Sequence, residues 1–435
     1  MSSEPNITTS AQSNSMDDAR WNKLHTLATF CTLGGTALDG YILGVVGDAI
    51  GAATDEMHFT PITQGLVGAS ALIGIFIGGL VFGRVADRWG RRTVFKWNLI
   101  AFVGLSLLQL VAVTTWDLAA YRVLLGVAIG VEYAVGAALL TEFAPARVRS
   151  ALLSTLQATW FVGFVGANFI SRAWSQDNWR VVLASSAIPA LIVALARLRL
   201  PESPRWLISQ GRLDDARAVV DKHFPAGTAL PEVETVEEPA KFRELFDRDH
   251  WRRSVYGGIF WACQVGPLFA IFTFITPVLD GIGLPSGFTR DFIMNMLQLG
   301  GAIVFIWIVA GTKRRMLVIS TFALMLVTLI LIGFPTLPLA VLAIATGVYM
   351  FTAAGASNLQ FVYPSEMFET RMRTSGVGFS ASMSRLGAAL ATYLLPVLMA
   401  TFGANVAIIM LALFPLVGLL GSVAWAPETR NKAIK

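Results

Sequence analysis

Four charged residues stand inside long apolar stretches of the sequence: Asp39, Arg122, Glu132 and Arg385. If those stretches cross a bilayer, each charge costs about 2.5–3.5 kcal/mol to insert, and such charges usually line a pathway or pair with an opposite charge. A carboxylate in this position is able to take up and release protons. A guanidinium stays charged and presents a planar set of donors that matches a carboxylate or phosphate. The four residues are therefore candidates for proton movement and anion binding.

Asp39 and Arg122 lie at similar depths in their apolar runs. Asp39 is eight residues from the end of the run 24–47, and Arg122 is five residues from the start of the run 117–140. At 1.5 Å per residue these depths agree within roughly 5 Å. An ion pair between the two side chains is therefore geometrically allowed, and it would serve either proton coupling or structure alone.

Glu132 lies ten residues beyond Arg122, which is about 15 Å deeper along a helix. Loss of hydration there favours the neutral carboxyl group, as a proton carrier requires. The alternative is a structural Glu132 held neutral by a neighbouring helix. The histidines offer no rival carrier, because all of them fall at helix ends, in loops or in the long central segment: His25, His58, His223 and His250.

Arg385 lies about ten residues into the run 376–398, near the expected midplane. No other charge interrupts an apolar run in the second half of the chain, so its partner is either across a central cavity or is the substrate itself. Polar and aromatic residues of neighbouring aliphatic runs are candidates for the cavity wall, although each could equally serve packing: Tyr41, Phe260, Trp261, Gln264, Phe269, Asn295, Gln298, Asn358 and Gln360.

The composition identifies the elements that hold these residues. Of the 435 residues, 55% are hydrophobic and only 14% are charged, against roughly a quarter charged in soluble domains. Uncharged runs of about 20 residues, enough to cross a bilayer as helices, recur along the chain. We predict spans near 24–47, 62–82, 94–113, 117–140, 151–171, 180–198, 254–279, 291–310, 316–333, 338–361, 376–398 and 404–425. The fold class is therefore an all-α membrane protein with twelve transmembrane helices in two six-helix bundles.

Lysine and arginine predict the orientation, because short cytoplasmic loops carry the excess of positive charge. With both termini inside, the inner segments hold 28 of these residues, and the outer loops hold three: Arg172, Arg180 and Arg290. The net charge of +5 is therefore a topology signal, and a nucleic-acid partner has no support. The expected segments are a cytoplasmic tail at 1–23, a bundle at 24–198, a cytoplasmic linker with amphipathic helices at 199–253, a second bundle at 254–425 and a tail at 426–435.

Several other classes of function lack their motifs. The two cysteines fall in predicted helices and define neither a disulfide framework nor a metal site. No hydrolase elbow, zinc-protease motif or phosphate-binding loop is present, so neither an enzyme nor an ATP-driven pump is indicated. We expect no cofactor and no metal.

A motif of charged residues occurs twice in the chain. Glu142, Arg147 and Arg149 return 224 residues later as Glu366, Arg371 and Arg373, and PES at 201–203 returns as PET at 427–429, an offset of 226. Two motifs that repeat at nearly the same separation indicate that the two halves arose by duplication.

The segment GRVADRWGRR at 83–92 resembles the signature loop of the major facilitator superfamily, and YRVLLGVAIGVEY, EFAPARVR, PESPRWL and PETR extend the resemblance over both halves. The resemblance implies a substrate site near the midplane between the halves and an acidic residue of the first helix coupled to the arginine of the fourth. It also implies ion-pair networks that latch the cytoplasmic face, with these candidate gate residues: Gly83, Asp87, Arg88, Gly90, Arg91, Glu142, Arg147, Arg149, Glu366, Arg371 and Arg373.

Within the superfamily, PESPRWL resembles sugar porters, whereas GVEYAVG at 130–136 resembles metabolite:proton symporters. The segment GVGFSASMSRLGAAL at 376–390 resembles organic-anion transporters, in which an arginine at the position of Arg385 faces the substrate. The hypothesis is a proton-coupled symporter of a small organic anion, such as an aromatic or other carboxylate, in a bacterial inner membrane and acting as a monomer. The alternatives are a sugar or polyol symporter, then drug efflux, and from another class a nontransporting membrane sensor.

Overall fold

The structure is a computed structural model that describes residues 16–231, 242–248, 250–369 and 372–430, and no β-strand occurs among them. The first half of the chain begins with a short 3-10 helix, η1 (Met16–Asp18), and continues in helices. These are α1 (Lys23–Gly44), α2 (Val46–Met57), α3 (Pro61–Trp89), α4 (Arg91–Leu108), α5 (Thr115–Phe143), α6 (Ala146–Ala184) and α7 (Ala187–Arg197), with η2 (Gln109–Val111) after α4.

Two short helices, α8 (Pro204–Ser209) and α9 (Leu213–His223), follow in the central linker, and η3 (Phe242–Phe246) precedes the second half. The helices of that half are α10 (Trp251–Thr273), α11 (Ile275–Gly281), α12 (Phe288–Gly311), α13 (Arg314–Ile332), α14 (Leu339–Ala356), α15 (Leu359–Met367), α16 (Arg373–Phe402), α17 (Ala404–Leu411) and α18 (Leu413–Trp425).

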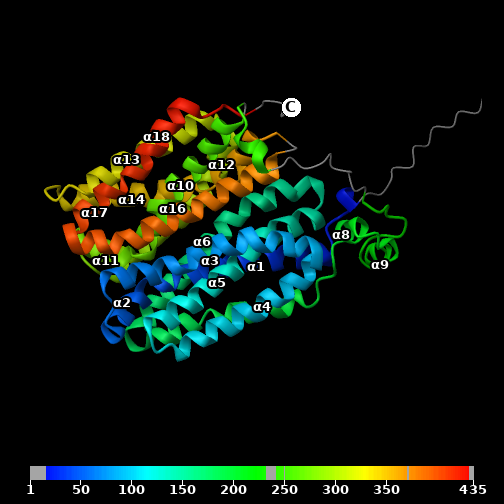
Figure 1. Cartoon of the computed structure of the whole chain (residues 1–435), viewed down its shortest axis with the longest axis horizontal. Coiled ribbons are helices and arrows are strands. Elements are labelled where there is room, and N and C mark those ends of the chain that lie inside the picture. Colours follow the sequence, from blue (N-terminus) through cyan, green and yellow to red (C-terminus); the bar gives the residue numbers. More distant parts are fainter. Residues whose placement is uncertain (1–15, 232–241, 249, 370–371, 431–435) are drawn as a thin grey trace, which may run out of the picture.

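The long helices of the two halves lie side by side in two groups, the first half below and the second above in Figure 1. The linker helices α8 and α9 lie beyond one end of the helices, and we refer to this end as the linker side. Helices α2, α11 and α17 lie at the other end, which we refer to as the opposite side. The distribution of lysine and arginine predicts that the linker side is cytoplasmic.

Each predicted span overlaps a helix of the structure. In the described part of the chain, ten helices are long and apolar enough to cross a membrane, or eleven if the bent pair α1 and α2 counts as one span. Helix α5 covers the remaining predicted span, 117–140, but is not among these. Helix α6 is 39 residues long and has non-helical backbone at Asn178 (φ −159°, ψ 84°). The predicted fifth span, 151–171, lies before this break, whereas the sixth, 180–198, takes in the last residues of α6 and all of α7.

Glycines bring α3 and α5 into close contact, because a residue without a side chain lets two helix backbones approach each other. A methyl group built on Gly74 or Gly78 of α3 would collide with the backbone of α5, and one on Gly126 would collide with the backbone of α3. One built on Gly130 would lie 2.6 Å from the carbonyl oxygen of Ile75. The two helices therefore pack backbone to backbone, which fixes the rotation of α5 about its axis.

The repeated PES and PET phrases make equivalent contacts in the two halves. A Glu202 oxygen accepts the backbone N–H of Arg92 at the start of α4 (3.1 Å), and a Glu428 oxygen accepts that of Arg314 at the start of α13 (3.0 Å). Both carboxylates therefore satisfy free N–H groups at a helix N-terminus, where the helix dipole favours negative charge. The shared role gives a physical reason for the repeated glutamate.

The N-terminal 3-10 helix ties the linker to the first half. Asp17 of η1 pairs with Arg149 at the start of α6 and with Arg205 of α8, the latter at 3.0 Å. Met16 is buried in a small apolar cluster that also contains Phe143 of α5 and Phe224 just after α9. The linker helices are thereby held against the bundle.

Candidate functional site

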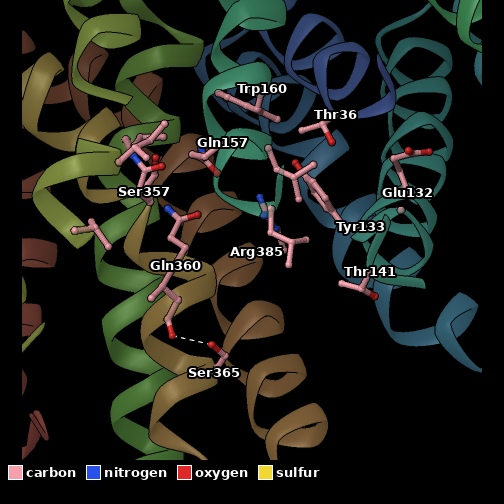
Figure 2. A pocket seen from close by; sticks show the side chains of 18 of the residues that line it. Thr36, Glu132, Tyr133, Thr141, Gln157, Trp160, Ser357, Gln360, Ser365 and Arg385 are labelled. Atoms are coloured by element: carbon pink, nitrogen blue, oxygen red, sulfur yellow. Dashed lines mark hydrogen bonds between the residues drawn. The ribbon is translucent and has the colours of Figure 1, made fainter. Parts of the chain in front are cut away.

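A cavity of about 520 Å³ lies between the two halves. Figure 2 shows Gln157, Gln360, Tyr133 and Arg385 gathered around one part of it. The first half contributes Thr36, Glu132, Tyr133, Gly136, Thr141, Leu153, Leu156, Gln157 and Trp160, and the second half contributes Leu268, Phe269, Ile306, Val309, Ser357, Asn358, Gln360, Val362, Ser365 and Arg385. The cavity therefore combines one cationic group with aromatic, amide and aliphatic walls.

The cavity extends toward the linker side. Its lining reaches Thr141 and Ser365, near the ends of α5 and α15 on that side. Toward the opposite side it is closed by aromatic contacts between the halves: Trp160 lies 5.7 Å from Phe269, and Phe161 lies 6.1 Å from Phe272, between ring centroids. A solute would therefore reach this cavity from the linker side.

Polar contacts between the halves continue the closure beyond the aromatic layer. Asn168 of α6 donates to the Asn295 side chain of α12 at 3.1 Å, and both are buried. One turn farther, the Arg172 guanidinium lies 3.4 Å from the Asp291 carboxylate. We refer to these four residues as the α6–α12 contact, and it holds the opposite side shut in this conformation.

Arg385 is the cationic group of the cavity, and it is 8% exposed. Its guanidinium carbon lies 5.0 Å from the ring centroid of Tyr133 and 5.7 Å from that of Phe269, within the range of a cation–π interaction. Its Nη1 has no hydrogen-bond partner, and no carboxylate lies within 4.0 Å of it, among the residues that the structure describes. A buried guanidinium in this state is suited to binding an anion.

Asp39 of α1 is fully buried, and neither carboxylate oxygen forms a hydrogen bond with a described residue. Charged groups near it in the described part of the chain include Glu132, Arg197 and Arg385. An ionised carboxylate is costly to bury without a donor, and taking up a proton removes that cost.

The expected ion pair between Asp39 and Arg122 is not formed. Arg122 instead donates from Nε to the carbonyl oxygen of Val67 in α3 (3.3 Å). At 100° per residue, the ten residues between Arg122 and Glu132 turn these side chains about 80° apart around α5. Because α5 packs closely on α3, Arg122 faces α3 while Glu132 faces α1 and α7. Matching depths could not reveal this difference in direction.

Glu132 forms a buried ion pair with Arg197, the last residue of α7. The Arg197 Nη1 donates to Glu132 Oε2 at 2.8 Å, and Nη2 bonds the other carboxylate oxygen and the carbonyl of Cys31 (2.8 Å). The guanidinium also lies over the Phe95 ring, 4.0 Å from its centroid. The sequence analysis counted Arg197 among the positive charges of the inner segments, although it stands at the inner end of the predicted span 180–198, and so did not include it among the buried charges. Its position at the end of an apolar run was the signal for a possible buried partner.

Only some of the other residues predicted for the cavity wall line the cavity. Phe269, Asn358 and Gln360 line the cavity as expected. Gln264 does not line it, but its side-chain oxygen accepts from Gln360 and so fixes that amide. The remaining predicted residues are not among the lining residues: Tyr41 bonds Ser185 (2.7 Å), Gln298 contacts Met350, Asn295 belongs to the α6–α12 contact, and Phe260 and Trp261 are buried in α10.

The lining residues of the first half that the sequence analysis missed include Tyr133, Gln157 and Trp160. Tyr133 directly follows Glu132, and the other two are a polar and an aromatic residue in the run 151–171. The same rule that selected Gln360 and Phe269 in the second half would have selected them.

Two of the predicted gate residues, Arg149 and Glu366, make contacts within their own halves. Arg149 pairs with Asp17, and Glu366 accepts from Arg314 (3.1 Å) and from Thr429 (2.6 Å). Gly90 lies at the N-cap of α4, Glu142 in the last turn of α5, Arg147 is exposed at the start of α6, and Arg373 begins α16. Arg371 and the side chains at positions 83, 87, 88 and 91 lie outside the described residues. Their latching role remains a prediction.

Among the described residues, no group of three or more histidine, cysteine or acidic side chains is arranged to hold a metal ion. The chemistry that the site offers is therefore the binding of a solute by Arg385 and the amides, with Asp39 and Glu132 as carboxylates nearby.

Comparison with known proteins decides the family. Residues 11–435 match the sequence model of the family described as sugar (and other) transporter. The chain belongs to this transporter family. It is a multi-pass inner-membrane protein of the major facilitator superfamily, and it is not an enzyme.

Two Escherichia coli relatives cover nearly the whole transporter. It is 36% identical to the inner membrane metabolite transport protein YgcS, over 95% of this chain and 94% of that protein. It is 35% identical to the putative metabolite transport protein YaaU, over 97% and 96%. The inward-open structure of the E. coli xylose transporter XylE superposes with a TM-score of 0.76 at 21% identity, covering 94% of this chain and 98% of that chain. At this identity the superposition concerns the fold alone.

Proposed function

We propose that this transporter carries a small organic anion, an aromatic or other carboxylate, by proton-coupled symport with alternating access. The observation that carries the proposal is Arg385: a buried guanidinium lines the central cavity, lies over two aromatic rings, and has no carboxylate within 4.0 Å among the described residues. A planar carboxylate supplies both the missing charge and the acceptors for the free N–H groups.

The charges around the cavity support coupling to one proton carrier. Glu132 and Arg197 neutralise each other, which leaves Asp39 as the negative group that acts on Arg385. A second anion next to an ionised Asp39 would raise the electrostatic cost of the site. Protonation of Asp39 removes that charge, so proton uptake and anion binding favour each other. We assign proton carriage to Asp39 and, by their pairing, a supporting role to Glu132 and Arg197.

A sugar or polyol symporter is the second candidate. The amides of Gln157, Gln360 and Asn358 line the same cavity, and such groups bind hydroxyls. The structural neighbour XylE is a proton:xylose symporter. A more distant relative, 24% identical over 81% of this chain, is the niacin transporter NiaP of Acinetobacter baylyi. Relatives of both substrate types therefore exist, and the charge on Arg385 favours the anion.

The deciding experiment measures ligand affinity and thermal stability on the same purified proteins. The ligands are monocarboxylates (benzoate, nicotinate and lactate) and neutral solutes (xylose, arabinose and myo-inositol). Charge-assisted hydrogen bonds contribute roughly 1.5–3 kcal/mol, so Arg385→Lys should weaken carboxylate binding by about tenfold or more, and Arg385→Ala by more than Arg385→Lys. The melting temperature without ligand should stay near that of the parent.

Two results would contradict the proposal. Full carboxylate affinity in Arg385→Lys would exclude direct anion recognition by this residue. Binding of sugars but of no carboxylate by the parent protein would put the sugar symporter first. A large drop in ligand-free stability of Arg385→Lys would instead identify a structural arginine.

A further inference from the structure

Tyr133 and Arg385 meet across the cavity from different halves of the transporter. Tyr133 belongs to α5 of the first half and Arg385 to α16 of the second, and the guanidinium carbon lies 5.0 Å from the tyrosine ring centroid. Figure 2 shows the two side chains beside each other at the cavity. A carboxylate that binds the N–H groups at the edge of this guanidinium therefore also lies near Tyr133.

The Tyr133 hydroxyl lies where a ligand in the cavity can reach it. Tyr133 lines the cavity and is partly exposed there. Its hydroxyl makes no hydrogen bond of normal length and angle with any residue in the described part of the chain. The hydroxyl oxygen is also not fully buried, so a molecule in the cavity can reach it.

The indole N–H of Trp160 lies beside the Tyr133 hydroxyl. The Trp160 Nε1 is buried without a hydrogen-bond partner of normal geometry among the described residues, and it lies close enough to the Tyr133 hydroxyl to act on it. An indole N–H is only a donor. In a contact between the two groups, the tyrosine oxygen is therefore the acceptor. The phenolic O–H is thereby left to donate into the cavity.

We infer that Tyr133 is the second anion-binding group of the site: its O–H donates to the carboxylate that Arg385 holds, while its ring supports the guanidinium. This inference rests on the proposed function and adds a group from the first half. Trp160 acts as a positioning residue for the hydroxyl. Because the anion then contacts both halves at once, its binding stabilises arrangements in which α5 and α16 lie close together.

The test separates the contribution of the Tyr133 hydroxyl to anion binding from that of the aromatic rings around the guanidinium. Tyr133→Phe keeps the ring and removes the O–H, whereas Phe269→Leu removes the other ring from the guanidinium and touches no hydroxyl. Tyr41→Phe is the matched control, because the Tyr41 hydroxyl is engaged by Ser185 and lies outside the cavity lining. The probes are benzoate and nicotinate, with benzamide and nicotinamide as neutral analogues of the same shape.

A hydrogen bond to a charged group is worth about tenfold or more in affinity. Tyr133→Phe should therefore weaken benzoate or nicotinate binding by about that factor, with little change in ligand-free melting temperature and little change for the amides. Tyr41→Phe should bind all four probes as the parent does. Trp160→Phe should weaken carboxylate binding to a smaller extent, because the hydroxyl loses its orientation but not its presence.

The outcomes distinguish this inference from the proposed function. Unchanged carboxylate affinity in Tyr133→Phe, with weakened affinity in Arg385→Lys, overturns the role of the hydroxyl and leaves the anion transporter in place. An equal loss for carboxylates and amides in Tyr133→Phe also overturns it, because the hydroxyl would then not recognise charge. No loss in Arg385→Lys, or no carboxylate binding by the parent, overturns the proposed function and this inference with it.

Discussion

Glu132 of α5 and Arg197 at the end of α7 form a buried ion pair, with 2.8 Å between Arg197 Nη1 and Glu132 Oε2 and each side chain 2% exposed. The pair joins α5 to α7, and the Arg197 bond to the Cys31 carbonyl adds α1. Three helices of the first half are thus connected next to the cavity. Removing one partner would leave a buried charge alone.

The first prediction concerns this pair. Arg197→Met should destabilise the protein by about 3–5 kcal/mol, because the buried Glu132 carboxyl group is left without its partner. Glu132→Gln together with Arg197→Met should recover much of that loss, because neither charge remains. Thermal unfolding of the four proteins in a double-mutant cycle measures the coupling.

Arg199→Met, at an exposed position two residues on, is the control and should melt as the parent does. Additive effects of the two substitutions in the cycle would contradict the prediction.

The second prediction concerns proton coupling. Asp39→Asn should abolish accumulation of a carboxylate driven by a pH gradient in proteoliposomes but retain counterflow, because the amide cannot carry a proton while the alternating motion remains. Glu132→Gln should impair accumulation as well, but with a loss of stability that Asp39→Asn does not share, since Arg197 loses its partner. Normal accumulation by Asp39→Asn would show that the proton is carried elsewhere.

The third prediction concerns the α6–α12 contact. Asn295→Ala removes the buried hydrogen bond from Asn168, worth about 1 kcal/mol, and should shift the population severalfold toward conformations open on the opposite side. Spin labels at the exposed positions 55 and 286, on different halves, should then report longer distances. Gln298→Ala is the control, one turn deeper on α12 and bonded within the second half. Identical distance distributions in Asn295→Ala and the parent would count against a gate at this contact.

The fourth prediction concerns topology. Cysteines placed at the exposed positions Asp55 and Ser286 should react with an impermeant reagent added outside cells, whereas cysteines at Arg212 and Lys222 in the linker should react only after permeabilisation. The two native cysteines are buried, so they should contribute little background. Labelling of the linker from outside would reverse the predicted orientation.

The sequence by itself determined the class of protein and the rough positions of its spans. Hydrophobic runs long enough for a bilayer must be helical, because the membrane interior offers no other partner for backbone polar groups. The repeated PES and PET phrases indicated duplicated halves, and Glu202 and Glu428 indeed make equivalent contacts. The position of Arg385 near the middle of its run placed it in the central cavity before any neighbour was known.

Only the tertiary structure decided which buried charges meet. Depth along a helix follows from counting residues, but the direction of a side chain around the helix depends on what packs against it. The glycines of α3 and α5 fix the rotation of α5, which turns Arg122 toward Val67 and Glu132 toward Arg197. The meeting of Tyr133 with Arg385 likewise depends on how two separately encoded halves lie against each other, and no spacing within either half contains that information.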